Sequence, residues 1–372
     1  MDKGQLVFAQ LNAHLPRDVF RQCVAQYAGR YPTLSFSHWD QFLCMTFAQL
    51  TARTSLRDIT TCLRSQQRKL FFAGFRCSIA RSTLADANER RDSRIFEAFA
   101  QHLIGLAQFL YANEQLALDV ASVYAIDATT IDLCLNVFAW TPAANARAGV
   151  KVNTQLDLRG NIPSFVRITS TLVADASFLD HIRLEAGSFY LMDRAYMHFE
   201  RLYRFTQAAA FFVVRSKNKL LHRVVHQRPT CSGPIRSDDD ILLGGHFTRH
   251  AYPALLRRIE VHDADRDRTL ILLTNNFELH AEHIAQLYKS RWQVELFFKW
   301  IKQHLRIKAF VGTSPNAVKT QIWTAICTYV LVAIVKKRLH VRASLHAMLQ
   351  VLSVNLFERT PLEQLLAGAA VY

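Results

Sequence analysis

Residues 288–302 combine side-chain types that could act together as a polar site. Four polar residues recur there at steps of three, four and seven: Tyr288, Arg291, Glu295 and Lys302. Such steps return side chains to one side of a helix, and the apolar residues between them have the helical period. The stretch therefore predicts a single helix carrying one stripe of polar side chains.

Glu295 is the single acid between residues 286 and 342, a segment with eleven Lys or Arg residues. A lone carboxylate in this setting can form an ordinary helix ion pair, since Arg291 and Lys299 both lie four residues from it. The spacing Tyr-x2-Arg-x3-Glu-x6-Lys, however, resembles the signature of the DDE transposases of insertion-sequence family four at all four positions. The resemblance implies that Glu295 completes a metal-binding triad with two Asp residues.

Two Asp residues further up the chain have the position that such a triad needs. The β-branched and aromatic segment 122–127 predicts a strand ending at Asp127, and segment 187–193 predicts another ending at Asp193. A strand-ending Asp often only caps the next turn. The sequence Asp193-Arg194-Ala195-Tyr196, however, resembles the Asp-x-Gly/Ala-Tyr motif of the same family. Four competing acids lack that combined support: Asp132, Asp157, Asp175 and Asp180.

The order of elements after residue 110 predicts an α/β fold. Three strands are expected first, with a tight turn at 159–161 between the second and third, followed by helix, strand, helix and a buried strand at 208–215. This order matches a ribonuclease-H-like core, in which acids at neighbouring strand ends share one site. We expect this core over residues 111–372.

Residues 216–276 are expected to form a β-rich insertion, another point of resemblance to the family. The triplet at 238–240, Asp-Asp-Asp, lies between glycine-containing turns and predicts a solvated turn. Family members place a tryptophan in this insertion to stack on a flipped base, and none of the five Trp of this chain lies there. Tyr252 or Phe247 could stack instead.

Residues 1–110 are expected to form a helical domain. Ser55 lies three residues before Asp58 and predicts a capped helix start, and a second, more basic helix is expected from residue 82. Such a pair resembles a helix-turn-helix, which would place four side chains near DNA: Arg81, Ser82, Thr83 and Asn88. A plain helical bundle fits about equally well. The family resemblance implies that this domain recognises the element ends.

Composition favours a globular protein with a polyanionic partner. The chain has 372 residues, 50% hydrophobic content and a formal net charge of +15. Seven scattered cysteines without a CxxC pair indicate neither a zinc site nor a disulfide scaffold, and the amino terminus lacks a signal sequence. The uncharged run 323–335 is too short to span a bilayer and predicts a buried helix. We expect a cytoplasmic protein without a membrane partner.

The resemblance implies a transposase that binds the terminal repeats of its element and catalyses DNA cleavage and strand transfer by a cut-and-paste route. Asp127, Asp193 and Glu295 would be the catalytic, metal-binding residues, since oxygen ligands suit two Mg²⁺ ions or Mn²⁺ in their place. Five residues would contact DNA: Tyr288, Arg291, Lys302, Lys299 and Arg194. We expect double-stranded element ends and target DNA as partners and a homodimer assembled on DNA.

Two other functions are compatible with these residues. The first is a catalytically inactive DNA-binding protein derived from a transposase, which the intact triad disfavours. The second is a two-metal nuclease without strand transfer, which the sequence alone does not separate from a transposase.

Overall fold

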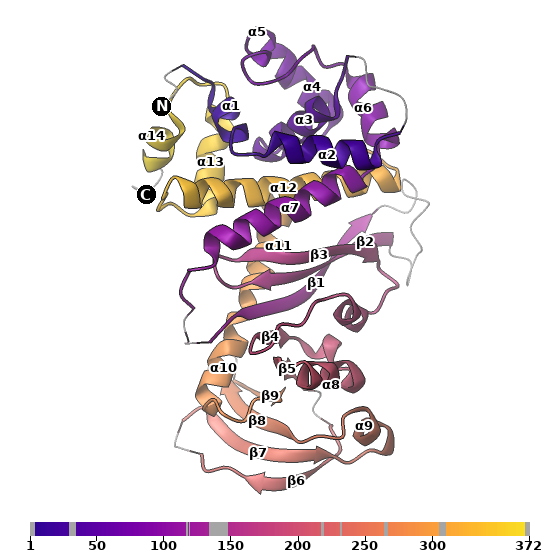
Figure 1. Ribbon diagram of the computed structural model, residues 1–372, viewed down its shortest axis with the longest axis vertical. Helices are drawn as coiled ribbons and strands as arrows, with labels where there is room; N and C mark the ends of the chain where they lie inside the picture. The colour runs from indigo at the N-terminus through magenta and orange to yellow at the C-terminus, as the bar shows by residue number, and fades with distance from the viewer. Residues whose placement is uncertain are drawn as a thin grey trace. The chain divides into compact units, whose positions relative to one another are not determined.

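A computed structural model of the protein describes residues 4–29, 35–116, 118, 120–133, 148–216, 219–230, 233–263, 267–304 and 310–368 (Figure 1). The chain divides into two compact units. Unit 1 contains residues 1–112, 131–149 and 298–372, and unit 2 contains residues 113–130 and 150–297. Residues 298–372, which we had expected within a core domain 111–372, thus group with the amino-terminal helices.

Unit 1 is helical in its described part. Its amino-terminal helices are α1 Val7–Asn12, α2 Arg17–Tyr27, α3 His38–Leu50, α4 Leu56–Ser65, α5 Gln67–Leu70, α6 Arg81–Arg90 and α7 Arg94–Tyr111. Its carboxyl-terminal helices are α12 Pro315–Arg338, α13 Leu345–Asn355 and α14 Leu362–Ala367. Side-chain capping starts several of them; the Ser55 hydroxyl, for example, accepts the Asp58 N–H at 3.1 Å, as predicted.

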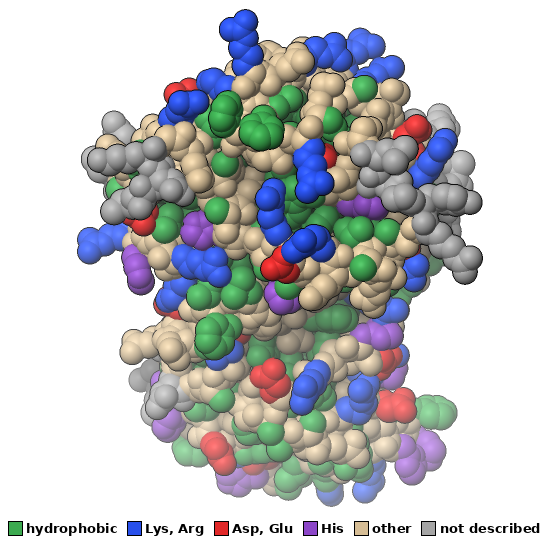
Figure 2. All heavy atoms as spheres, turned by 45° about the horizontal axis from the view of Figure 1, so that its top comes forward, with side chains coloured by type: hydrophobic (Ala, Val, Ile, Leu, Met, Phe, Trp, Pro, Cys, Tyr) green, Lys and Arg blue, Asp and Glu red, His purple; other side chains and the backbone are tan. Residues whose placement is uncertain are grey.

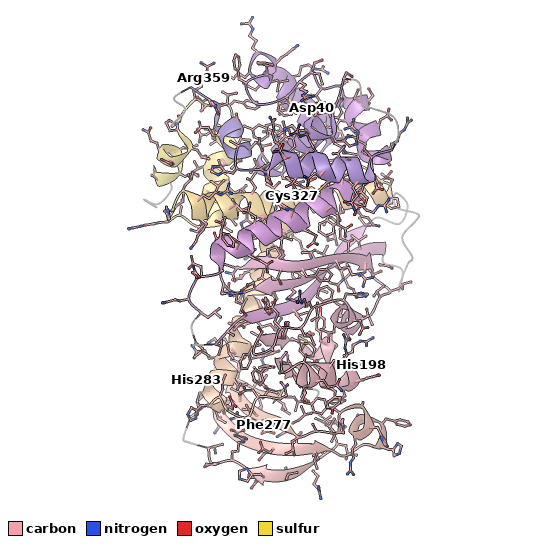
Figure 3. All side chains as sticks on the ribbon, in the orientation of Figure 1. Asp40, His198, Phe277, His283, Cys327 and Arg359 are labelled. Atoms are coloured by element: carbon pink, nitrogen blue, oxygen red, sulfur yellow. The ribbon has the colours of Figure 1, made fainter. Side chains whose placement is uncertain are left out.

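Helix α12 forms the centre of unit 1. It packs against α7, α3 and α6, and Figure 1 shows α7 and α12 side by side. The Cys327 thiol of α12 lies 3.8 Å from the Phe96 carbonyl oxygen of α7 (Figure 3). By length and composition α12 could cross a membrane, yet 94% of its most apolar window is buried inside the protein. The predicted buried helix is therefore present and extends beyond the uncharged run.

Unit 2 contains a nine-stranded sheet with the order β3-β2-β1-β4-β5-β9-β8-β7-β6. The strands are β1 Val123–Leu133, β2 Ala148–Asp157, β3 Ile162–Ser170, β4 Phe189–Met192, β5 Phe211–Arg215, β6 His222–Gln227, β7 Ile235–Leu243, β8 Leu256–Asp263 and β9 Arg268–Thr274. β4 pairs in parallel with both β1 and β5, whereas β2 and β3 form an antiparallel hairpin. Gly160 and Asn161 both have positive φ in its turn, as the predicted hairpin requires.

Helices and short helical turns cover both faces of this sheet. One face packs against α10 Ala281–Ser290 through Ile284, Leu287 and Tyr288. The other face packs against the 3₁₀ turns η1 Asp175–Asp180 and η2 Arg194–Tyr196 and the helix α8 Phe199–Gln207, with Tyr252 after α9 His246–Ala251. Side chains of β1 and β4 alternate between the two faces, so each strand contributes to both apolar clusters.

The Asp triplet is not a solvated turn, which corrects our expectation. All three residues lie within β7, where Asp238 and Asp239 are buried. Two buried hydrogen bonds of 2.7 Å join the Arg257 guanidinium on β8 to the Asp238 carboxylate. Arg228 Nε lies 2.9 Å from Asp240 Oδ1, and Arg258 Nη1 forms a longer ion pair of 3.8 Å with Asp239 Oδ2. The acids are accommodated in a strand because neighbouring segments supply a cation for each of them.

Replacement of Arg257 by Ala is expected to lower the free energy of unfolding by about 3–5 kcal/mol, because it leaves the Asp238 carboxylate buried and unpaired. The two side chains are 3% and 6% exposed. Arg204→Ala is the control, because its pair with Asp180 is 44% and 39% exposed and should contribute about 1 kcal/mol or less. Urea unfolding followed by circular dichroism would compare them, and equal losses would contradict the buried pair.

Candidate active site

Asp127 and Asp193 lie on neighbouring segments of the sheet. Asp193 directly follows β4, as predicted, but β1 continues past Asp127 to Leu133, so the predicted strand end at Asp127 is wrong. β1 and β4 are parallel, and Ile126 is paired in register with Met192, so the next residue of each chain segment is an Asp. The alternation of side chains places both on the sheet face that carries Val123 and Leu191, against which α10 packs. The strand register thus puts the two acids beside each other, and their common role in a catalytic site stays a prediction.

The polar stripe is carried by two helices rather than the single predicted one. α10 ends at Ser290 and α11 spans Trp292–His304, with Arg291 between them. The Arg291 N–H donates to the Tyr288 carbonyl, and the Val294 N–H donates to the Arg291 carbonyl. These bonds span three residues instead of four, so the chain tightens at Arg291 and changes helix there.

Arg291 joins two of the three predicted catalytic carboxylates. Its Nη1 lies 3.2 Å from Asp127 Oδ2, and its Nη2 lies 2.6 Å from Glu295 Oε1. The three side chains are only 15%, 20% and 32% exposed, so water screens these contacts less than those of a surface ion pair. The ordinary ion pair between Arg291 and Glu295 is present, and the same guanidinium also reaches Asp127 in β1.

Asp193 has a local role in addition to its position. Its Oδ1 accepts the Ala195 N–H at 2.7 Å and caps the 3₁₀ turn η2. The capping alternative is therefore realised for Asp193. Its charge nevertheless acts on the same site, because it raises the pKa values of Asp127 and Tyr288.

Burial raises the pKa of Asp127 from 3.8 to about 6, and the charges of Asp193 and Glu295 add to the rise. The Ala128 N–H and Arg291 oppose it without cancelling it. Burial acts to lower the pKa of Arg291, but Tyr288, Glu295 and Asp127 together raise it above its ordinary value. The cluster of carboxylates is therefore only partly neutralised by the one guanidinium.

The donor types suit a hard divalent cation, which prefers carboxylate oxygens. Within the part of the chain that the structure describes, no three Asp, Glu, His or Cys side chains are close enough to hold a metal ion. The Arg291 guanidinium lies between Asp127 and Glu295, with its nitrogens 3.2 Å and 2.6 Å from their carboxylate oxygens. The residues fit a divalent cation in type, provided that the guanidinium gives up its bridging position.

Two further residues belong to this environment and were not among the predicted site residues. Tyr196 is 1% exposed, and its hydroxyl has no hydrogen-bond partner in the described residues. Burial raises its pKa, and Asp127, Asp175 and Asp193 raise it further. Arg215 follows Val214, which pairs with Met192, so it ends its strand beside Asp193. The strand-end rule that identified the acids would also have identified Arg215.

The remaining predicted DNA contacts differ in exposure. Arg194 and Lys299 are exposed, and Lys302 is half-buried in the second half of α11. Tyr288 is buried, which raises the pKa of its hydroxyl, and its ring centroid lies 5.8 Å from the Arg291 guanidinium carbon. The DNA contacts of all these residues stay predictions.

Of the two aromatic residues considered for base stacking, only one is accessible. Tyr252 is 1% exposed, and its hydroxyl lies 2.7 Å from the Thr206 hydroxyl, so the proposal that it stacks on DNA is wrong. Phe247 in α9 is 86% exposed and stays a prediction.

The structure differs from the predicted helix-turn-helix in two ways: one predicted DNA contact is buried, and the segment between the two helices is too long. Arg81, Ser82 and Thr83 are exposed at the start of α6, but Asn88 is 1% exposed and accepts a hydrogen bond from Gln41 at 2.8 Å. Asn88 is therefore a core residue, not a DNA contact. The segment 66–80 between α4 and α6 includes the short helix α5, so it is longer than a helix-turn-helix turn of about 3–4 residues.

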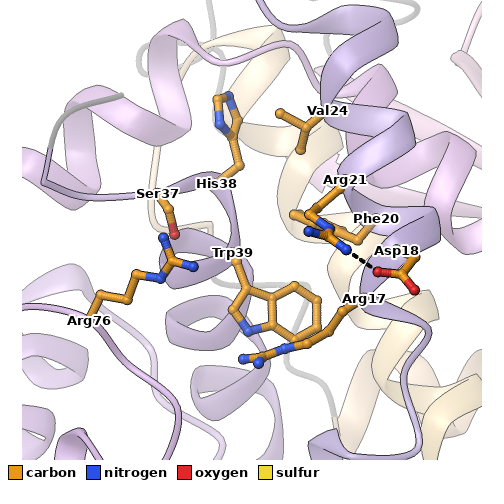
Figure 4. Close-up of a pocket in the computed structure, with 9 residues that line it drawn as sticks. All are labelled: Arg17, Asp18, Phe20, Arg21, Val24, Ser37, His38, Trp39 and Arg76. Carbon is orange, nitrogen blue, oxygen red and sulfur yellow. Dashed lines mark hydrogen bonds and ion pairs between the residues drawn. The ribbon is translucent and has the colours of Figure 1, made fainter. Parts of the chain in front are cut away.

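Unit 1 has a basic cavity of about 430 Å³ beside α2 and α3 (Figure 4). Arg17, Arg21 and Arg76 line it around the Trp39 ring, and the Arg17 guanidinium lies 4.9 Å from the ring centroid. Burial, aided by Arg91, lowers the pKa of the lining His38 to about 4, so this imidazole is neutral at pH 7. The arginines leave the cavity with a positive charge that suits an anion.

The raised pKa of Asp127 predicts a pH-dependent effect of Asp127→Asn. Below about pH 4 the carboxyl is protonated in both folded and unfolded chains, so the variant should differ little. Above about pH 6 folding must bury the ionised group, which costs on the order of 2–3 kcal/mol and is absent in the variant. We expect Asp127→Asn to be more stable than wild type at pH 8.

Thermal unfolding at pH 4 and pH 8 in chelator would test this expectation. Asp132→Asn is the matched control, because Asp132 is an exposed residue of the same strand. A stability gain that is equal at both pH values would contradict the assigned cost of burying the charge.

Known proteins match most of the chain. Residues 119–331 match the family described as "Transposase DDE domain", and residues 3–76 match a domain of unknown function, DUF4372. A Sinorhizobium fredii protein named as transposase y4zB is 35% identical, over 68% of this chain and 70% of its own. A Geobacillus stearothermophilus protein named as the transposase of insertion sequence element IS5377 is 32% identical, over 55% and 54%.

A Synechocystis protein named as the transposase of insertion sequence element IS4SA is 23% identical, over 84% of this chain and 87% of its own. A cryo-EM structure of a piggyBac transposase synaptic complex with hairpin DNA has a TM-score of 0.47 and 9% identity, over 94% of this chain and 78% of the other. The family match spans Asp127, Asp193 and Glu295. The predicted family is confirmed: the chain belongs to the bacterial DDE-domain transposases.

Proposed function

We propose that this transposase binds the terminal repeats of its own insertion sequence and catalyses metal-dependent DNA cleavage and strand transfer with Asp127, Asp193 and Glu295. The observation that carries the proposal is the register of β1 and β4. It supports the proposal because the last pair of β1 with β4, Ile126 and Met192, directly precedes the two acids, and Arg291 contacts both Asp127 and Glu295.

We assign the catalytic core to the ribonuclease-H-like class. Five strands support this assignment, because their order is β3-β2-β1-β4-β5 with β1, β4 and β5 parallel and β2 and β3 an antiparallel hairpin. β6 to β9 extend the sheet beyond β5 and precede α10. They correspond to the β-rich insertion 216–276, which accounts for the long chain segment between Asp193 and Glu295.

Members of this family generally use divalent metals, and the ions proposed here are Mg²⁺, two per site, with Mn²⁺ as a substitute. When bound, such ions supply Lewis-acid stabilisation and activate water or a DNA 3′-hydroxyl. Asp127 on β1, Asp193 after β4 and Glu295 on α11 would hold this positive charge. The raised pKa of Asp127 supports that role, because an additional positive charge would favour the ionised carboxylate.

Arg291 holds Asp127 and Glu295 together and presents planar donors that fit phosphate oxygens. Lys302 and Lys299 on α11, Arg194 beside Asp193 and the Tyr288 hydroxyl are proposed to hold the scissile strand. These contacts would position the phosphate rather than read the sequence.

Sequence recognition is assigned to the amino-terminal residues 1–110, whose exposed Arg81, Ser82 and Thr83 lie at the start of α6. The matched domain of unknown function covers much of this region. A cut-and-paste route on double-stranded element ends and target DNA, a homodimer assembled on DNA and a cytoplasmic location complete the proposal. The alternative is a nuclease without strand transfer. The cleavage assay described next tests it, because only strand transfer produces joined DNA.

Replacing any one carboxylate should abolish cleavage while leaving DNA binding intact, because Asn or Gln keeps the side-chain shape but removes its charge. Asp127→Asn, Asp193→Asn and Glu295→Gln would be assayed with DNA carrying the ends that flank the gene, with and without Mg²⁺. Asp132→Asn, the exposed acid of the same strand, should keep wild-type cleavage. Full Mg²⁺-dependent cutting by a triad variant would remove that residue from the site. Cleavage without any joined product would support the nuclease.

Arg291→Ala and Lys302→Ala should each slow single-turnover cleavage of pre-bound end DNA at least roughly tenfold, because both residues are proposed to position the scissile phosphate. Arg291→Lys should not rescue, since one ammonium cannot reproduce the planar pair of donors that a guanidinium presents to phosphate oxygens, whereas Lys302→Arg should rescue in part if Lys302 acts as a point charge. Circular dichroism controls for folding. Wild-type rates in both Ala variants would rule out the phosphate contacts.

A further inference from the structure

Two adjacent phenylalanines project from the amino-terminal helices. Phe71 and Phe72, directly after α5, are 79% and 58% exposed, and their rings meet edge to face at 5.8 Å. Single exposed apolar residues are common on proteins, but two neighbouring aromatic rings form a patch that favours a partner.

The segment that carries them is firmly anchored. Leu70, Ala73 and Phe75 on either side are 5%, 1% and 2% exposed. Backbone hydrogen bonds of 3.0–3.1 Å link residue 73 to 69, 74 to 71 and 75 to 70, and Gly74 makes the turn with a φ of +98°. The backbone that carries the two rings is therefore held in place before any partner binds, which reduces the entropy lost on binding.

The surroundings of the two rings are strongly basic. No acid occurs between Asp58 and Asp86, and that interval contains Arg64, Arg68, Lys69, Arg76 and Arg81. The Arg359 guanidinium lies over the Phe72 ring at 5.7 Å. Figure 2 shows hydrophobic side chains exposed among Lys and Arg side chains on the face of unit 1 turned toward the viewer. A second copy of this cationic surface would be repelled, whereas a polyanion would be attracted.

We infer that Phe71 and Phe72 form a wedge that inserts between neighbouring base pairs of duplex DNA and kinks it, with the surrounding arginines and Lys69 on the flanking phosphates. Apolar side chains of this kind unstack a base step and bend DNA by roughly 20–90°, and the bend brings more phosphate against the protein. This inference rests on the proposed DNA binding by the amino-terminal region and adds a deformation of the bound duplex to it.

The experiment uses the full chain and a duplex bearing the element ends. Fluorescence anisotropy reports binding, energy transfer between the duplex ends reports bending, and 2-aminopurine within the duplex reports unstacking. The Phe71→Ala/Phe72→Ala double variant should lose the bend and the 2-aminopurine signal and bind roughly tenfold more weakly. Phe71→Leu/Phe72→Leu should retain much of the bend, because Leu also serves as a wedge.

Phe109→Ala is the matched control. Phe109 is also 79% exposed, but residues 95–122 contain no Lys or Arg, so this variant should bend DNA as wild type does. Circular dichroism confirms folding of each variant.

Wild-type bending by the double Ala variant, or an equal loss in Phe109→Ala, would overturn the wedge. A different result would be a double Ala variant that bends DNA normally but loses self-association or binding to anionic lipid vesicles. That result would assign the two rings to a second copy of the chain or to a lipid surface, and it would also overturn the wedge. Wild-type protein that binds the duplex without bending it would overturn the wedge alone. Absence of any binding would overturn the DNA recognition on which the wedge rests.

Discussion

The candidate site depends on the two ion pairs that Arg291 forms, one with Asp127 and one with Glu295. Together they join Asp127 in β1 to the junction of α10 and α11, 164 residues later in the chain, and balance charges that would otherwise repel one another. The change of helix at Arg291 makes the contact possible, because the guanidinium then faces both carboxylates. Arg291 lies between Asp127 and Glu295, where the proposed divalent cation would bind. The contact that orders the site would therefore have to open before the cation could bind.

Much of this arrangement could be predicted from the sequence because it follows local periodicity. Apolar segments that lead to Asp127 and to Asp193 indicate two strands, although β1 continues past Asp127 to Leu133, and helical spacing places Arg291 beside Glu295. Other features depend on partners far along the chain. The sequence around Asp238 predicts a polar turn, because its ion pair with Arg257 on the next strand is not visible from local sequence. Asn88 is predicted to be exposed, because its hydrogen bond with Gln41 of another helix cannot be seen in the sequence.

The division into two units could not be predicted from the sequence either, because it also depends on contacts between distant parts of the chain. Composition shows that α12 is apolar, but not that α3, α6 and α7, more than 200 residues earlier, supply its packing partners. The predicted boundary at residue 110 follows a true change from helices to strands, yet compactness is set by contacts rather than by position in the chain. The functional region is recognisable locally, whereas the packing that supports the helical unit is not.

The central position of α12 also has a consequence for synthesis of the protein. Chains fold from the amino terminus as they leave the ribosome, but the apolar faces of α3 and α7 pack against residues 315–338. Those faces stay exposed until all nine strands of the sheet have been translated. The helical unit is therefore completed after the strands that carry Asp127 and Asp193, so no nascent chain can present a finished helical unit without the sheet of the candidate site.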